Sequence, residues 1–219
     1  MKRYVTLNEI SDGRLYTADD LVRAGCHNCS GCDQCCHDMG RSIILDPCDI
    51  HHLVSHLSVT FEMLLQHAVE LNVADGVILP NLRMQPENGS CYFLDENHRC
   101  SIHSFRPGLC RLFPLGRYYE DGSFKYILQT HECPAKNKTK VRIRSWLEID
   151  DLAQYESYIQ CWHQLLKQAE AVISAEKDQN AVRQLNVYWL KLFYMTPYNS
   201  DFYNDFYMRA DKIKSALTF

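Results

Sequence analysis

Residues 26–36 read CHNCSGCDQCC and hold five of the chain's 11 cysteines. Two other residues separate each neighbouring pair among the first four of them, and Cys36 comes directly after Cys35. Two intervening residues allow a tight turn to direct both sulfurs at one ion, so this spacing recurs in zinc and iron–sulfur sites. Five thiolates this close would repel one another unless a cation neutralised them. The segment therefore predicts a bound metal ion or cluster.

The competing interpretation is a set of buried or disulfide-bonded cysteines. Neighbouring Cys35 and Cys36 are poorly placed to bridge each other, because a disulfide needs converging Cβ vectors. The first 20 residues begin with basic side chains but contain no apolar run typical of a secretory signal. We therefore expect a cytoplasmic protein, and in a reducing compartment a cysteine framework more often indicates metal binding or catalysis than disulfides.

Composition narrows the functional classes. The chain has 219 residues, is 46 % hydrophobic and 23 % charged, and carries a formal net charge of −4. This apolar fraction suffices for a buried core in one domain, or in one domain with an appendage. Basic residues form no long run, which argues against a nucleic-acid partner, and no apolar stretch approaches the length of about 18 residues that a membrane helix needs.

A second group consists of Cys91, Cys100, Cys110 and Cys133, at long and unequal spacing. Structural zinc sites usually pair two separated knuckles, and this group has none. In the first group, the run from Cys26 through Cys29 and Cys32 to Cys36 repeats the bacterial ferredoxin spacing, although His37 stands where a proline usually follows. Spacing therefore favours an iron–sulfur cluster, with zinc as the alternative, and the two groups could share one site.

Three segments together resemble a known family: CSGCDQCC at 29–36, CYFLDENHRCSIHSFRPGLCRLFP at 91–114 and HECP at 131–134. They are similar to the YkgJ-type cysteine-cluster family, a zinc- or iron-chelating domain named for its CxxCxxCC motif, over about residues 26–149. The eight cysteines of the family pattern fall here on Cys29, Cys32, Cys35, Cys36, Cys91, Cys100, Cys110 and Cys133. Cys26 is an added candidate ligand that the pattern does not include.

The resemblance implies an intracellular protein that carries a 4Fe–4S cluster or zinc. The family includes flagellin lysine N-methylases, so one implied role is a protein-lysine methyltransferase that would use S-adenosylmethionine on a protein substrate. A simple electron carrier with a redox partner, a structural zinc module for protein interaction and oxygen-dependent iron chemistry stay open. The chain shows no glycine-rich phosphate loop and no nucleophile elbow, and it indicates no catalytic residue.

Other side chains near the cysteines have two interpretations each. The arginines could balance an anionic cluster or pair with Asp95 and Glu96, and the histidines could replace thiolate ligands. These side chains are Arg99, Arg106, Arg111, Arg117, His37, His103 and His131. Cys48, Cys161 and the aromatic residues of the C-terminal tail are interpreted as core residues, and the His51, His52 and His56 group as a surface or interface feature.

The pattern predicts an α+β fold in which short antiparallel strands surround the cysteines and a helical part follows. We expect a polar extension at 1–25, a metal-binding core at 26–140 and packed helices at 141–219. Asp46 and Pro47 begin a predicted helix, a second is expected over 60–71, and Asp121-Gly122 marks a hairpin. Apolar residues three or four apart predict helices over 152–173 and 180–193, and Ser200 and Asp201 are expected to cap a last helix that ends at Leu217.

Overall fold

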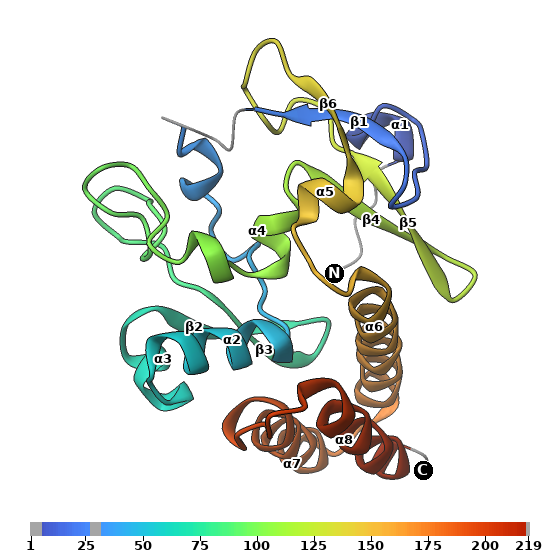
Figure 1. Cartoon of the computed structure of the whole chain (residues 1–219). Coiled ribbons are helices and arrows are strands. Elements are labelled where there is room, and N and C mark those ends of the chain that lie inside the picture. Colours follow the sequence, from blue (N-terminus) through green and yellow to red (C-terminus); the bar gives the residue numbers. More distant parts are fainter. Residues whose placement is uncertain (1–5, 27–31, 218–219) are drawn as a thin grey trace. The chain divides into compact units, whose positions relative to one another are not determined.

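The computed structural model describes residues 6–26 and 32–217. The chain divides into two compact units, each built from two stretches of sequence. Unit 1 comprises Met1–Met39 and Met84–Gln160, and unit 2 comprises Gly40–Arg83 and Cys161–Phe219. Helices combine with short antiparallel strand pairs in Figure 1, so the predicted α+β class is confirmed. The predicted division at residues 25 and 140 stays a prediction.

Unit 1 contains two strand pairs and short helices. Its elements are α1 (Leu7–Ile10), β1 (Leu21–Gly25), α4 (Gly108–Leu112), β4 (Leu115–Glu120), β5 (Ser123–Leu128), β6 (Thr139–Arg142), α5 (Ile143–Leu147) and the beginning of α6 (Leu152–Ala175). Single 3-10 turns cover Gln34–Cys36 and His103–Phe105. The cysteine segments therefore lie mostly in turns between regular elements.

The predicted hairpin is confirmed as β4 and β5. Leu115 pairs with Leu128 and Glu120 pairs with Ser123, which leaves Asp121 and Gly122 as the two-residue turn. Both turn residues have positive φ, 50° and 74°, as a turn of this type requires. Tyr126 on β5 is buried, and its hydroxyl donates to a Glu156 carboxylate oxygen at 2.7 Å. This bond attaches the hairpin to the first turns of α6.

The N-terminal stretch pairs with distant segments, which the sequence did not predict. In β1, Val22 pairs with Val141 of β6 in an antiparallel ladder, and Ala24 is fully buried. Tyr16 exchanges backbone hydrogen bonds with Tyr126 at 2.8 and 2.9 Å. Residues 134–140 are polar and rich in lysine, as is typical of a loop, yet a strand begins at Thr139 because its partner lies more than 100 residues earlier in the chain.

Unit 2 contains one hairpin, five α-helices and one π-helix among its described residues. These elements are α2 (Pro47–Leu57), α3 (Phe61–His67), β2 (Val69–Ala74), β3 (Val77–Leu82), the remainder of α6, α7 (Gln179–Leu190), a π-helix (Lys191–Met195) and α8 (Phe202–Leu217). The predicted start of α2 is confirmed, since Asp46 accepts a bond from the backbone N–H of Asp49 at 2.9 Å and Pro47 occupies the first turn.

The predicted helix over 60–71 is only partly correct. It begins as expected, with Thr60 capping α3, but it ends at His67, and Val69 starts β2. Asp75 and Gly76 then form the hairpin turn to β3, with φ of 50° and 86°. On the other edge of β3, the Leu45 N–H donates to the Pro80 carbonyl at 2.8 Å, and the Leu82 N–H donates to the Ile43 carbonyl at 3.0 Å. This tertiary pairing overrides the local helical pattern.

The aromatic C-terminal part forms the core of unit 2. Trp162 on α6 lies within about 5 to 6 Å, centroid to centroid, of four other aromatic rings. These rings belong to Trp189, Phe193, Tyr194 and Phe206, and all of them are buried. Tyr194 also donates its hydroxyl to the Leu45 carbonyl at 3.1 Å. The structure thus places this part of the tail in the core, as expected.

Arg209 secures the end of the π-helix. Its Nη1 donates to the carbonyls of Leu192 and Thr196 at 2.7 Å each, and Nη2 donates to Pro197 O at 2.6 Å. Asp205 balances the charge at 2.9 Å, with both side chains buried. Carbonyls left without helical partners thereby gain donors, which fixes the turn between the π-helix and α8.

His51 gives unit 2 a predictable response to acid. Its half-buried ring stacks on Phe202 at 5.2 Å between centroids, and burial, with the charges of His56 and Arg209, lowers the pKa of His51. The unfolded chain takes up a proton near the ordinary pKa of about 6.5, whereas the folded chain resists it. Stability is therefore full above that pH and falls as pH decreases below it.

We expect urea unfolding to show a larger loss of unfolding free energy between about pH 7.5 and pH 5.5 in the wild type than in His51→Phe. Phenylalanine keeps the ring against Phe202 and has no proton to accept. Equal losses in the two proteins would contradict this assignment.

No helix among the described residues is long and apolar enough to cross a membrane.

Candidate metal centre

All the described cysteines of the predicted site fall in unit 1. Cys48 and Cys161, which are interpreted as core residues, fall in unit 2. Cys48 is 4 % exposed and lies 3.9 Å from His52 (Sγ to Nε2), whereas Cys161 is only partly buried. Cys29 lies outside the described residues, as does the rest of 27–31.

A short antiparallel contact joins the two cysteine groups. The Cys91 N–H donates to the Cys36 carbonyl at 2.7 Å, and the Asp38 N–H donates to the Gly89 carbonyl at 2.9 Å. Between these bonds, His37 pairs with Ser90. Residues more than 50 positions apart are thus held side by side, and the backbone brings Cys36 next to Cys91.

A compact turn then returns the chain to Cys100. The Leu94 N–H donates to the Cys91 carbonyl at 3.0 Å, and Leu94 forms a β-bridge with Cys100. Asp95 accepts bonds from the backbone N–H groups of Asn97 and Arg99 at 2.9 and 2.8 Å, and closes the turn. Residues 91–94 thus form isolated bridges rather than a regular strand.

Electrostatics shows that several thiols share one neighbourhood. A hydrogen bond with Cys36, together with burial, raises the pKa of the Cys35 thiol well above its usual range. Burial raises the pKa of Cys91 to about 11, with a smaller increase from the charges of Cys100 and Cys35. A hydrogen bond with the Phe93 backbone opposes part of this increase. Burial also raises the pKa of Cys100. Thiols crowded in this way ionise together only when a cation compensates their charge.

Asp33 ties the first group to the turn before Cys100. Its Oδ2 lies 3.0 Å from His37 Nε2 and 2.7 Å from His98 Nδ1. The bonds with His37 and His98 hold the pKa of Asp33 below its usual value. His37 therefore has a carboxylate partner here, and this arrangement resembles the outer hydrogen bonds that orient side chains around metal sites.

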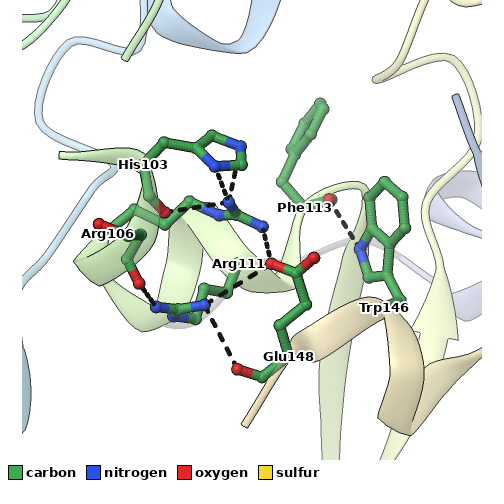
Figure 2. A network of polar contacts seen from close by, with 7 residues as sticks. His103, Arg106, Arg111, Phe113, Trp146 and Glu148 are labelled. Atoms are coloured by element: carbon green, nitrogen blue, oxygen red, sulfur yellow. Dashed lines mark hydrogen bonds and ion pairs between the residues drawn. The ribbon is translucent and has the colours of Figure 1, made fainter. Parts of the chain in front are cut away.

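Figure 2 shows a second polar network around the segment between Cys100 and Cys110. Arg106 contacts both ring nitrogens of His103 at 2.8 and 2.6 Å, and its Nη2 donates to Glu148 Oε2 at 3.3 Å. Arg111 contacts the same carboxylate at 3.9 Å and also donates to the Ser104 carbonyl. The carboxylate that pairs with both Arg106 and Arg111 in this network belongs to Glu148, which the sequence did not indicate.

The remaining candidates lie on several other segments of unit 1. Cys110 lies on α4, Cys26 directly follows β1, and the Cys133 carbonyl accepts a bond from Lys138 Nζ at 2.7 Å. His131 is exposed with φ of 69°. Arg117 is placed differently from the other arginines. Its guanidinium carbon lies 5.6 Å from the Phe124 ring centroid and 5.7 Å from the Tyr155 ring centroid, and it donates a hydrogen bond to the Tyr155 hydroxyl.

The donor set is chemically suited to zinc or an iron–sulfur cluster, because both favour thiolate ligands. Within 6–26 and 32–217, however, no three Cys, His, Asp or Glu side chains form a group that could hold an ion. The structure brings Cys35, Cys36, Cys91 and Cys100 into one neighbourhood, and it leaves the grouping of the eight cysteines as a prediction.

Sequence reasoning missed Asp33, His98 and Glu148. His98 lies on a turn with φ of 57°, and Glu148 follows α5 with φ of 53°. Neither position has a spacing signal relative to the cysteines. Asp33 lies inside the first cysteine run, and its position beside Cys32 is the one sequence signal that could have suggested a supporting role.

Comparison with known proteins adds one finding. A family model named CxxCxxCC, described as a "Putative zinc- or iron-chelating domain", matches residues 28–144. This range covers more than half of the 219-residue chain and includes all eight cysteines of the predicted set. No curated protein and no solved structure matches the chain.

Proposed function

This chain belongs to the CxxCxxCC family of zinc- or iron-chelating domains, and we propose that unit 1 binds its metal with cysteines from both groups. The observation that carries the proposal is the contact between Cys36 and Cys91, since it joins the end of one group to the start of the other. The proposed ligands come from Cys29, Cys32, Cys35, Cys36, Cys91, Cys100, Cys110 and Cys133, with Cys26 as an added candidate.

We further propose that the metal is iron in an iron–sulfur cluster. The support is the ferredoxin-like run from Cys26 to Cys36 and the absence of paired zinc knuckles in the sequence. The arginine side chains near the cysteines are compatible with an iron–sulfur cluster, because hydrogen-bond donors and cations around cluster sulfurs stabilise the anionic centre. Zinc is the alternative, and it would make unit 1 a structural module for protein interaction.

Anaerobic purification of the full chain tests the metal directly. We expect a coloured protein in which iron and acid-labile sulfide are stoichiometric with polypeptide. A colourless protein with stoichiometric zinc and no sulfide contradicts the iron–sulfur proposal and supports the zinc alternative. A protein that retains neither metal after anaerobic purification, and binds neither on reconstitution, contradicts metal binding as such.

Three candidate roles of the metal can be distinguished by measurement. A protein-modifying enzyme similar to the flagellin N-methylases of the family would bind S-adenosylmethionine in calorimetry and methylate a protein substrate. An electron carrier would show a reversible redox couple without substrate and would need a redox partner. A structural zinc module would unfold when a chelator removes its metal, and redox agents would leave that metal bound.

A further inference from the structure

The β2–β3 hairpin of unit 2 has one occupied edge and one open edge. On β3, the Ile78 N–H donates to Asn186 Oδ1 at 2.7 Å. Residues 43–45 bond the Pro80 carbonyl and the Leu82 N–H at 2.8 and 3.0 Å, and Pro80 itself has no N–H. All these bonds lead away from β2, so the outer edge of β3 is occupied.

The pairing register shows which backbone groups of β2 point the other way. In an antiparallel pair, residues alternate between directing both backbone groups at the partner strand and directing both away from it. Ile78 and Pro80 direct theirs away, and they pair with Val73 and Leu71. The N–H and C=O groups of Leu71 and Val73 therefore point outward from β2. No residue within 6–26 or 32–217 forms a hydrogen bond with these four groups.

The β2 strand lacks the features that usually prevent a strand edge from pairing. It reads VELNVA, without proline or lysine, and its six consecutive pairs from Val69 to Ala74 contain no bulge. Arg83 covers only the start of the edge, where its Nη2 donates to the Val69 carbonyl at 3.2 Å. Beyond that point the side chains of Leu71 and Val73 are 40 % and 71 % exposed. Outward backbone groups and exposed apolar side chains thus coincide at these two residues.

We propose that this edge pairs with the same edge of a second copy of the chain, in an antiparallel ladder around a two-fold axis at Asn72. This register places Leu71 of each copy opposite Val73 of the other, so it uses both open residues. An axis at Leu71 would bring Val73 to Val69, whose carbonyl is occupied, and an axis at Val73 would bring Leu71 to the turn residue Asp75. The pairing lies in unit 2 and does not depend on the proposed function.

The side chains of β2 are complementary to themselves in this register. Leu71 and Val73 share one face of the strand, so two copies bring four apolar side chains together. On the other face Asn72 meets its own copy, and Glu70 lies opposite Ala74. The Glu70 carboxylate already accepts a bond from the Asn72 amide at 3.2 Å. No like charges lie directly opposite each other, and each copy offers this edge once, so the assembly is a closed dimer.

Sedimentation of the full-length, anaerobically purified protein over a series of concentrations tests the pairing. We expect a monomer–dimer equilibrium in the wild type. Val73→Lys should raise the dimer dissociation constant about tenfold, because it places an ammonium group opposite Leu71 of the other copy, and lysine blocks pairing at natural strand edges. The matched control is Val187→Lys, since Val187 is a 57 % exposed valine on α7 of the same unit. Its dissociation constant should equal that of the wild type.

Two double variants test the register. Leu71→Glu/Val73→Lys places opposite charges across the axis at both paired positions, whereas Leu71→Lys/Val73→Lys places like charges there. At low salt we expect the first to dimerise about tenfold more tightly than the second. Equal dissociation constants in these two variants would contradict the axis at Asn72.

Hydrogen exchange of the wild type needs no substitution and so does not depend on a variant that folds. The N–H groups of Leu71 and Val73 should exchange more slowly in concentrated than in dilute protein, because pairing gives them acceptors. A dimer that leaves these two groups unprotected contradicts the proposal, as does a dimer that Val73→Lys does not weaken. A chain that stays monomeric at every concentration also contradicts it, and favours an extended segment of another protein as the occupant.

Discussion

Replacing Cys36 by serine, or Cys91 by serine, is expected to remove most of the bound metal in each case. Each variant loses one thiolate from a different cysteine group, and the Cys91 N–H bond to the Cys36 carbonyl holds the two groups together. A hydroxyl is a poor substitute for a thiolate at a soft metal centre. Metal per polypeptide, measured after anaerobic purification, should therefore fall to a small fraction of the wild-type value in both variants.

Cys161→Ser provides the matched control for this pair. Cys161 is a free, partly buried cysteine in α6 of unit 2, outside the predicted ligand set. We expect its metal content to equal that of the wild type. If Cys36→Ser loses its metal while Cys91→Ser keeps it fully, the first group binds alone, and the proposal that both groups contribute is wrong.

Trp162→Ala is expected to destabilise unit 2 by about 3 to 5 kcal/mol, the usual cost of truncating a large buried aromatic side chain. The indole lies 5.2 Å from Trp189 and 5.1 Å from Phe193 between ring centroids, and it is buried. Alanine would leave a large cavity among rings that are themselves packed together. Urea unfolding followed by circular dichroism measures the change in unfolding free energy.

Val187→Ala is the corresponding surface control. Val187 is 57 % exposed on α7, two residues before the buried Trp189. We expect its effect to be within about 0.5 kcal/mol, as for most surface substitutions. A loss of stability in Trp162→Ala no greater than that in Val187→Ala would mean that the aromatic cluster is not the core of unit 2.

The features that sequence could predict depend on local signals. Asp46-Pro47 begins α2, Asp121-Gly122 turns the β4–β5 hairpin, and the three- and four-residue apolar spacing after Asp151 gives the long helix α6. In each case the residues that determine the element lie within or next to it. The family resemblance likewise required only the cysteines and their order, and the family model match confirms the family.

The features that sequence missed depend on partners distant along the chain. β1 pairs with β6 across more than 100 residues, and β2 exists because β3 and residues 43–45 complete a small sheet where local spacing favoured a helix. The supporting side chains of the site behave in the same way. Asp33 meets His98 and Arg106 meets Glu148 through tertiary contacts that no short-range pattern encodes.

The central claim is that cysteines of both groups coordinate one protein-bound metal centre in unit 1. An X-ray absorption spectrum at the metal edge of the anaerobically purified protein tests it most directly, recorded for the wild type and for Cys91→Ser. We predict a first shell made of sulfur, at about 2.3 Å if the metal is zinc, and a loss of metal or of sulfur scatterers in the variant. A wild-type first shell of nitrogen and oxygen alone would contradict the claim, as would a sulfur shell that Cys91→Ser leaves unchanged.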